Sequence, residues 1–122
     1  MSGAATHGIF QFSGTPPQAD VTVDLGQCMK TRSLLQQIGA ALAFPTWYGA
    51  NFDALYDCLS APTTPATICL CGLSGYARQQ PDEFAIFIDV LHAACEARAQ
   101  DDLPLCICLD TPVRDIPRWP AP

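Results

Sequence analysis

Two short, wholly apolar segments constrain the fold more than any other feature of this sequence. Residues 67–73 read TICLCGL and residues 105–109 read LCICL, with no charged side chain in either. Apolar runs of roughly 4–8 residues are typical of strands buried on both faces of a sheet. Residues 19–25 instead alternate apolar and polar side chains, which predicts a third, half-buried strand. We therefore expect three strands, two of them fully buried.

Three other segments have the periodicity of amphipathic helices. Thr31 is the expected N-cap of the first, and Pro45 ends it. Asn51 opens the second, and Pro81 suits the first turn of the third. The predicted helices span residues 31–43, 51–60 and 81–98.

Strands that alternate with helices favour a parallel sheet with right-handed crossovers. The sequence therefore predicts an α/β fold, in which a three-stranded parallel sheet is packed by helices. Residues 8–12 could add a further N-terminal strand. We place the domain at residues 19–110, between an N-terminal extension (1–18) and a Pro-rich tail (111–122), which Trp119 could anchor to the domain.

The charge of the chain argues against nucleic acid as a partner. Among 122 residues, 12 acidic and 6 basic side chains give a net charge of −6. Nucleic acid is bound through Lys and Arg, and an acidic domain repels its phosphates. The same charge attracts basic proteins, so we expect a protein partner with a positive surface.

The seven cysteines do not indicate a disulfide framework. Their number is odd, and the opening residues, MSGAATHGIFQF, have neither the basic nor the apolar region of a secretory signal peptide. No apolar run approaches the length of a membrane span. These features are typical of a cytoplasmic protein with reduced thiols, which is the location we expect.

Residues 44–60, FPTWYGANFDALYDCLS, join an aromatic turn to an acidic helix. Asp53 and Asp57 are four residues apart and share one helix face, while apolar residues occupy another. Like charges at this spacing cost a few tenths of a kcal/mol, and no Lys or Arg occurs from residue 33 to residue 77 to relieve them. A solvated helix face and an acidic recognition face for a cationic partner both account for these residue types.

This stretch carries a resemblance to a known family. From Phe44 to Leu59 the sequence runs through Pro, two aromatics, Gly, Asn, then Asp-Ala-Leu, an aromatic and Asp. In this pattern it resembles the barstar family of intracellular inhibitors of secreted bacterial ribonucleases. The likeness is close over residues 31–60 and extends to about Asp110 through the order of elements. It implies a three-stranded parallel sheet covered by helices, with no cofactor and no catalysis.

Carried over residue by residue, the resemblance implies roles in binding a nuclease. Asp57 would be the central anchor, bonding Arg and His groups of the nuclease active site, and Asp53 the second charged contact. Trp47 would stack on a catalytic His of the partner. Asn51 would hold the corner between loop and helix, and Gly49 would permit the turn. The expected partner-binding residues are Trp47, Tyr48, Gly49, Asn51, Asp53, Tyr56 and Asp57.

One acidic contact of the family has no counterpart at the aligned position. A contact Glu on the third major helix of the family prototype aligns with Ala93, and Glu96 lies nearly one turn later. The sequence leaves open whether Glu96 takes over that role.

Metal binding and catalysis have weaker support. Four cysteines alternate with apolar residues in two predicted strands, so their thiols could share one side of the sheet and bind zinc. Because they lie within strands and free Cys is commonly buried, packing is the favoured role. His7 and His92 are the only histidines, and no motif places a nucleophile beside either, so an enzyme is not expected. The cysteines concerned are Cys69, Cys71, Cys106 and Cys108.

The sequence therefore predicts an intracellular inhibitor of a basic ribonuclease or related toxin. It would block the active site with an acidic helix face and need no metal or cofactor. The alternative is a barstar-like binding or immunity module for another basic protein.

Overall fold

Four short strands form one parallel sheet in the part of the chain that the structure describes. The computed structural model describes residues 7–61, 65–100, 102 and 104–118. The strands are β1 (Gly8–Gln11), β2 (Val21–Asp24), β3 (Thr67–Cys71) and β4 (Cys106–Leu109), in the order β1-β4-β3-β2. All three pairings are parallel, with Ile68 beside Ile107 and Cys69 beside Cys108. The predicted α/β class and parallel sheet are confirmed, and the extra N-terminal strand is present as β1.

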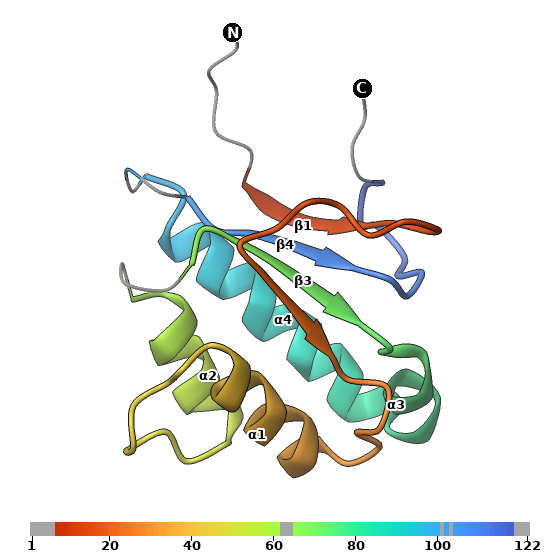
Figure 1. Ribbon diagram of the computed structural model, residues 1–122, viewed down its shortest axis with the longest axis horizontal. Helices are drawn as coiled ribbons and strands as arrows, with labels where there is room; N and C mark the ends of the chain where they lie inside the picture. Colours follow the sequence, from red (N-terminus) through yellow and green to blue (C-terminus); the bar gives the residue numbers. More distant parts are fainter. Residues whose placement is uncertain (1–6, 62–64, 101, 103, 119–122) are drawn as a thin grey trace, which may run out of the picture.

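Helices cover one face of this sheet (Figure 1). The three that the sequence predicts are α1 (Thr31–Ala41), α2 (Phe52–Leu59) and α4 (Pro81–Ala97). Their apolar stripes face the strands because each helix has one side to remove from water. A fourth helix, α3 (Ser74–Gln79), was not predicted.

Tertiary contacts account for α3. Its six residues are too few for a helix that is stable alone. The ring of Tyr76 is fully buried beneath it. Immediately before its first turn, the carboxylate of Asp110 accepts hydrogen bonds from the N–H groups of Gly72 (2.6 Å) and Leu73 (3.3 Å). The residue that supports this turn is therefore distant in sequence.

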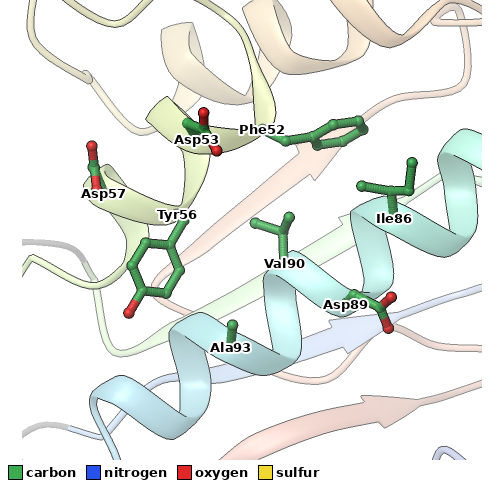
Figure 2. Close-up of a pocket in the computed structure, with 8 residues that line it drawn as sticks. All are labelled: Phe52, Asp53, Tyr56, Asp57, Ile86, Asp89, Val90 and Ala93. Atoms are coloured by element: carbon green, nitrogen blue, oxygen red, sulfur yellow. The ribbon is translucent and has the colours of Figure 1, made fainter.

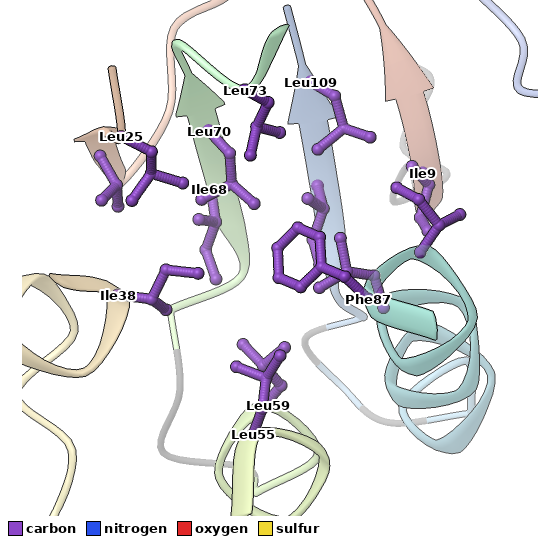
Figure 3. Close-up of a cluster of buried hydrophobic side chains, with 14 of the residues drawn as sticks. Ile9, Leu25, Ile38, Leu55, Leu59, Ile68, Leu70, Leu73, Phe87 and Leu109 are labelled. Carbon is purple, nitrogen blue, oxygen red and sulfur yellow. The ribbon is translucent and has the colours of Figure 1, made fainter. Parts of the chain in front are cut away.

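The main core lies between the sheet and the helices (Figure 3). Aliphatic side chains from one face of the strands meet leucines of α1 and α2 and the large side chains of α4. Removing each such side chain from water contributes about 1.5–3 kcal/mol before entropy is counted. Members that are at most 2% exposed include Leu34, Leu35, Ile38, Leu55, Leu59, Ile68, Leu70, Phe87, Leu91, Ile107 and Leu109.

The opposite face of the sheet carries cysteines. Cys69, Cys106 and Cys108 are at most 2% exposed and pack with Phe10 and other neighbours in a second cluster. They share one face because alternate residues of a strand point the same way. The expectation that the strand cysteines share one side of the sheet is confirmed. We call this side the thiol face.

Residues 12–20, which we call the strap, cross the thiol face between β1 and β2. From β2 to β3 to β4 the chain steps across the sheet in one direction, with helical connections on one face. From β1 to β2 it steps back past two strands, so a right-handed connection must pass over the other face. Phe12 and Ala19, near the two ends of the strap, pack on the thiol cluster.

The prediction that Thr31 caps α1 is wrong. The N-cap residue is Lys30, whose side chain makes no capping bond, and Thr31 is the first helical residue. Its hydroxyl instead bonds to the hydroxyl of Tyr76 (2.7 Å) and to the carboxylate of Glu83. The side chain thus ties α1 to α3 and α4, a role that depends on distant residues.

Residues after β4 return to the edge of the sheet at β1. Gln11 pairs with Arg118 in a parallel bridge, and its Nε2 donates to the carbonyl oxygens of Val113 (3.0 Å) and Ile116 (2.5 Å). Trp119, the expected anchor, lies outside the described residues. The domain boundaries at residues 18 and 110 stay predictions.

Candidate functional site

A closed turn leads from α1 toward the acidic helix. The N–H of Phe44 donates to the carbonyl of Gly39 (2.9 Å), and that of Ala43 donates to the carbonyl of Ala40 (3.4 Å). Ala43 has a left-handed backbone, with φ of 54°. This is the Schellman arrangement, which satisfies the last carbonyls of a helix and usually places Gly at the left-handed position. The chain therefore leaves α1 in a fixed direction.

Tyr48 turns inward and fixes the loop. Its hydroxyl donates to the carbonyl of Leu35 (2.8 Å), and its ring lies edge-on to Phe44 with 4.9 Å between centroids. A Cβ on Gly39 would lie 2.5 Å from this ring, which explains a glycine inside α1. Burial raises the pKa of the Tyr48 phenol above its usual value. Its predicted contact with a partner stays a prediction.

Asn51 is the N-cap of the acidic helix, which the sequence predicted it to open. Its Oδ1 accepts a hydrogen bond from the N–H of Ala54 (2.8 Å). The left-handed residue of this turn is Ala50, with φ of 53°, and not Gly49. A side chain on Gly49 would come within 3.0 Å of Asn51 Nδ2. A larger residue at position 49 would therefore require the Asn51 amide group to shift by a few tenths of an ångström.

The acidic helix α2 divides into a packed face and an exposed face. Leu55 and Leu59 are buried, whereas Asp53, Tyr56 and Asp57 are exposed. Among the residues that the structure describes, none forms a hydrogen bond or an ion pair with either carboxylate. The two negative charges thus face outward without an internal cation.

A buried arginine holds the far end of α2. Arg98, just past α4, is 0% exposed, and its Nη1 donates to the carbonyl of Leu59 (3.3 Å). A positive charge at a helix C-terminus also interacts favourably with the helix dipole. With Asn51 at one end and Arg98 at the other, the position of α2 is fixed at both termini.

Asp57 lies between two hollows in the surface. The first is an open groove of about 510 Å³ between α2 and α4, which we call the α2–α4 groove (Figure 2). The second, of about 380 Å³, lies on the loop side of α2 and is lined by Trp47, Asp57, Cys58, Ala61 and residues 42–45. The groove is lined by Phe52, Asp53, Tyr56, Asp57, Ile86, Asp89, Val90 and Ala93.

Two aromatic side chains flank the carboxylates. Trp47 is 64% exposed and Tyr56 is 37% exposed, so both present ring area to solvent. Exposed aromatic rings beside fixed charges are typical of the residues that dominate protein interfaces. The structure therefore brings Trp47, Asp53, Tyr56 and Asp57 to one surface, whereas Asn51 and Tyr48 hold that surface in shape.

Sequence reasoning missed two residues of this surface. Ile86, 47% exposed, and Asp89, also exposed, lie on α4 and line the α2–α4 groove. Ala93, the residue aligned with the family's Glu, lines it too, but Glu96 does not. Asp89 is one turn before Ala93 on the same side of α4. A search at that spacing would have found it.

The thiol face offers no metal-site geometry in the described ranges of the chain. Sγ of Cys69 lies 3.7 Å from Sγ of Cys71, yet no group of three or more His, Cys, Asp or Glu side chains is arranged there to hold a metal ion. Burial raises the pKa of Cys69 to about 12, so this thiol stays protonated at neutral pH. His7 and His92 are both exposed.

Comparison with known proteins gives a match to a family model. The family model described as Barstar (barnase inhibitor) matches residues 18–110, about three quarters of the 122 residues. That description names an inhibitor and not an enzyme. A comparison with curated proteins finds no match. In the described ranges, no helix is both long and apolar enough to span a bilayer.

The matched region contains β2 to β4, all of α1 to α4 and the surface formed by Trp47, Asp53, Tyr56 and Asp57, while β1 and most of the strap precede it. The chain belongs to the Barstar family.

Proposed function

We propose that this protein is an intracellular inhibitor of a basic ribonuclease, which it inactivates by placing the exposed face of α2 in the active site. The catalytic cleft of a ribonuclease is cationic because it binds RNA phosphates. Carboxylates on a rigid helix can occupy the positions of those phosphates. The protein then acts by occlusion, without catalysis of its own.

The observation that carries this proposal is the state of Asp53 and Asp57. Both are exposed on a helix that is capped by Asn51 and tied down by Arg98, and no described residue pairs with them. Charges held in place before binding lose less entropy when they meet a partner. Complementary charge also accelerates association and favours the correct partner over others.

Trp47 and Tyr56 support the same proposal. Their exposed rings border the carboxylates, Trp47 on the loop side and Tyr56 in the α2–α4 groove. Such rings can exclude water around a charged contact, which strengthens it. We infer that Trp47 stacks on a side chain of the nuclease beside the site where Asp57 binds.

The test is titration of purified ribonucleases with the protein. Barnase and a panel of other basic microbial ribonucleases are assayed against wild type, Asp57→Ala and a control, Asp82→Ala. Asp82 is an exposed acid on the first turn of α4, outside the groove, so the control removes the same charge elsewhere.

Wild type should inhibit at least one nuclease at equimolar amounts. Asp57→Ala should weaken inhibition by at least about thirtyfold, the effect of a contact worth roughly 2 kcal/mol. The Asp82→Ala control should change it less than about threefold. Inhibition that survives in Asp57→Ala, or a panel that wild type leaves fully active, would overturn the proposal.

A barstar-like binding or immunity module for a different basic protein is a second candidate. It is favoured by Ala93, which stands in the groove where the resemblance placed an acidic contact. The groove therefore has a different charge pattern from the family prototype. In that case Asp57→Ala would still abolish binding to the basic partner, but no ribonuclease of the panel would be inhibited.

A further inference from the structure

A third surface hollow lies beside the first turn of α2, where the starts of α1 and α4 also meet. Its volume is about 450 Å³. Asn51 and Phe52 border it on the side of α2, and the buried Leu35 contributes to its floor. Lys30 and Arg32, at the start of α1, line it as well. We call it the basic hollow.

The sign of the surface charge reverses across Phe52. This side chain lines both the α2–α4 groove and the basic hollow. All charged residues that line the groove are Asp, whereas the hollow is lined by two cations and one carboxylate, that of Glu83. The Glu83 carboxylate already accepts a hydrogen bond from the hydroxyl of Thr31. A cationic patch therefore adjoins the acidic surface, on a chain whose net charge is −6.

The internal structure of the domain does not explain Lys30 and Arg32. Both side chains are exposed and, among the described residues, neither has a hydrogen-bond partner or an ion-pair partner. The helix dipole disfavours cations at the start of a helix. The first turn of α1 has no acidic residue that would offset them. Their position therefore weakens α1, so the stability of the fold does not account for it.

The hollow fits an acidic side chain of a protein partner. A carboxylate would receive two parallel hydrogen bonds from the guanidinium of Arg32, and the ammonium of Lys30 would supply a second positive charge. The half-buried ring of Phe52 would exclude water on one side, which strengthens a charged contact. A phosphate also matches the positive charge, but the adjoining carboxylates repel a polyanion such as nucleic acid.

We propose that the basic hollow binds an Asp or Glu of the same ribonuclease, at a point beside its cationic cleft, and that Arg32 and Lys30 are the specificity-determining residues of this contact. The proposal rests on the proposed function, because the hollow adjoins the acidic surface through Phe52. A surface that is acidic throughout attracts any cationic protein. Two neighbouring patches of opposite sign match only a partner with the reverse pattern, so the hollow selects among basic nucleases.

The experiment uses a charge reversal whose local and long-range effects have opposite signs. Arg32→Glu and the control Arg114→Glu change the net charge equally, and both positions are exposed. Arg114 follows β4 and lines neither the hollow nor the groove. Either variant is more negative than wild type, so long-range attraction to a basic nuclease should increase in both. Lys30→Glu is the second test variant.

Association and dissociation rates are measured by surface plasmon resonance, with the nuclease that wild type inhibits most strongly. Arg32→Glu should weaken binding by about tenfold or more, and Lys30→Glu by about threefold to tenfold, both mainly through faster dissociation. Arg114→Glu should leave affinity unchanged or raise it by up to about threefold, through faster association. Arg32→Glu that binds as tightly as Arg114→Glu would overturn the inference.

Two further measurements separate a lost contact from a damaged fold. Thermal unfolding of Arg32→Glu should occur at the same temperature as in wild type or at a higher one, because the helix dipole favours an acid in the first turn of α1. A complete set of single Asp→Lys and Glu→Lys variants of the nuclease should contain one that restores affinity for Arg32→Glu. The absence of any such variant would also contradict the inference.

The two proposals fail in different ways. If Asp57→Ala abolishes inhibition but Arg32→Glu behaves like Arg114→Glu, the inhibitor function stands and the role of the hollow is wrong. If wild type inhibits no nuclease, or if Asp57→Ala inhibits as well as wild type, the function fails and the inference falls with it.

Discussion

The two faces of the sheet are made from the same strands but are covered in different ways. On the helix side, large aliphatic side chains of β3 and β4 pack against residues of the helices, which cover this face of the sheet (Figure 1). On the thiol face, cysteines of the same strands meet the strap. A helix with its side chains is about 10–12 Å across, whereas an extended segment can lie closer to a sheet. Close packing therefore calls for larger side chains on one face and smaller ones on the other.

The largest expected effect compares two neighbours on β3 that face opposite sides. Leu70→Ala should lower the free energy of unfolding by about 2–5 kcal/mol, because it leaves a cavity in the main core. Cys69→Ala removes only a sulfur atom from the thiol face and should cost about 1 kcal/mol. Urea unfolding in reducing buffer measures both. Equal losses would show that the two faces of the sheet contribute equally to the free energy of unfolding.

A second substitution removes part of the cover of the thiol face. Phe12 of the strap is half-buried on the thiol cluster, so Phe12→Ala should cost about 1–2 kcal/mol, less than the usual loss for a fully buried Phe.

Thiol reactivity gives an independent measure of how well the strap protects the thiol face from solvent. Cys71 is half-buried and the other six cysteines are buried, so in the wild type only Cys71 should react rapidly with an aromatic disulfide reagent. Phe12→Ala should accelerate the reaction of Cys69 and Cys108 while leaving that of Cys95, on the helix side, unchanged. Uniform acceleration of all thiols would instead indicate global unfolding.

Alkaline pH should destabilise the protein by a smaller amount near pH 10. Burial raises the pKa of Cys69 and of Cys95 from 9.0 to about 12. Between these values the unfolded chain loses thiol protons that the folded chain retains, so stability is complete below pH 9 and falls as pH rises toward 12. Urea unfolding at pH 7.5 and pH 10 measures the fall. Cys69→Ala should reduce the slope, and an unchanged slope would contradict the role of this thiol.

The smallest expected effect is an increase in stability from a substitution at the end of α1, on the helix side of the sheet. Ala43 is exposed and left-handed at the end of α1, where glycine has no steric penalty. Ala43→Gly should therefore raise the free energy of unfolding by about 0.5–1 kcal/mol. As a control, Ala40→Gly, inside α1, should lower it by about 1 kcal/mol. A loss in both variants would mean that the left-handed conformation carries no strain.

Most of the predicted elements depended on local rules and were correct. The apolar runs at β3 and β4, the alternation at β2 and the Pro81 start of α4 all express preferences of neighbouring residues. Thr31 shows the limit of such rules, because its hydroxyl is used by Tyr76 and Glu83, more than 40 positions away. Helix α3 was not predicted for the same reason, since it is stabilised by burial of its own Tyr76 in the core and by Asp110, which is distant in sequence.

By itself, the sequence determined the strands, the amphipathic helices and the spacing that sets Asp53 and Asp57 on one face of α2, because these depend on residues a few positions apart. Only the tertiary structure decided which residues join them. The packing of α2 against α4 creates the groove and brings Asp89 and Ile86 to it, and the return from β1 to β2 carries the strap over the cysteines. Such neighbours depend on how helices and strands pack in space, and this packing cannot be read from the pattern of residues a few positions apart.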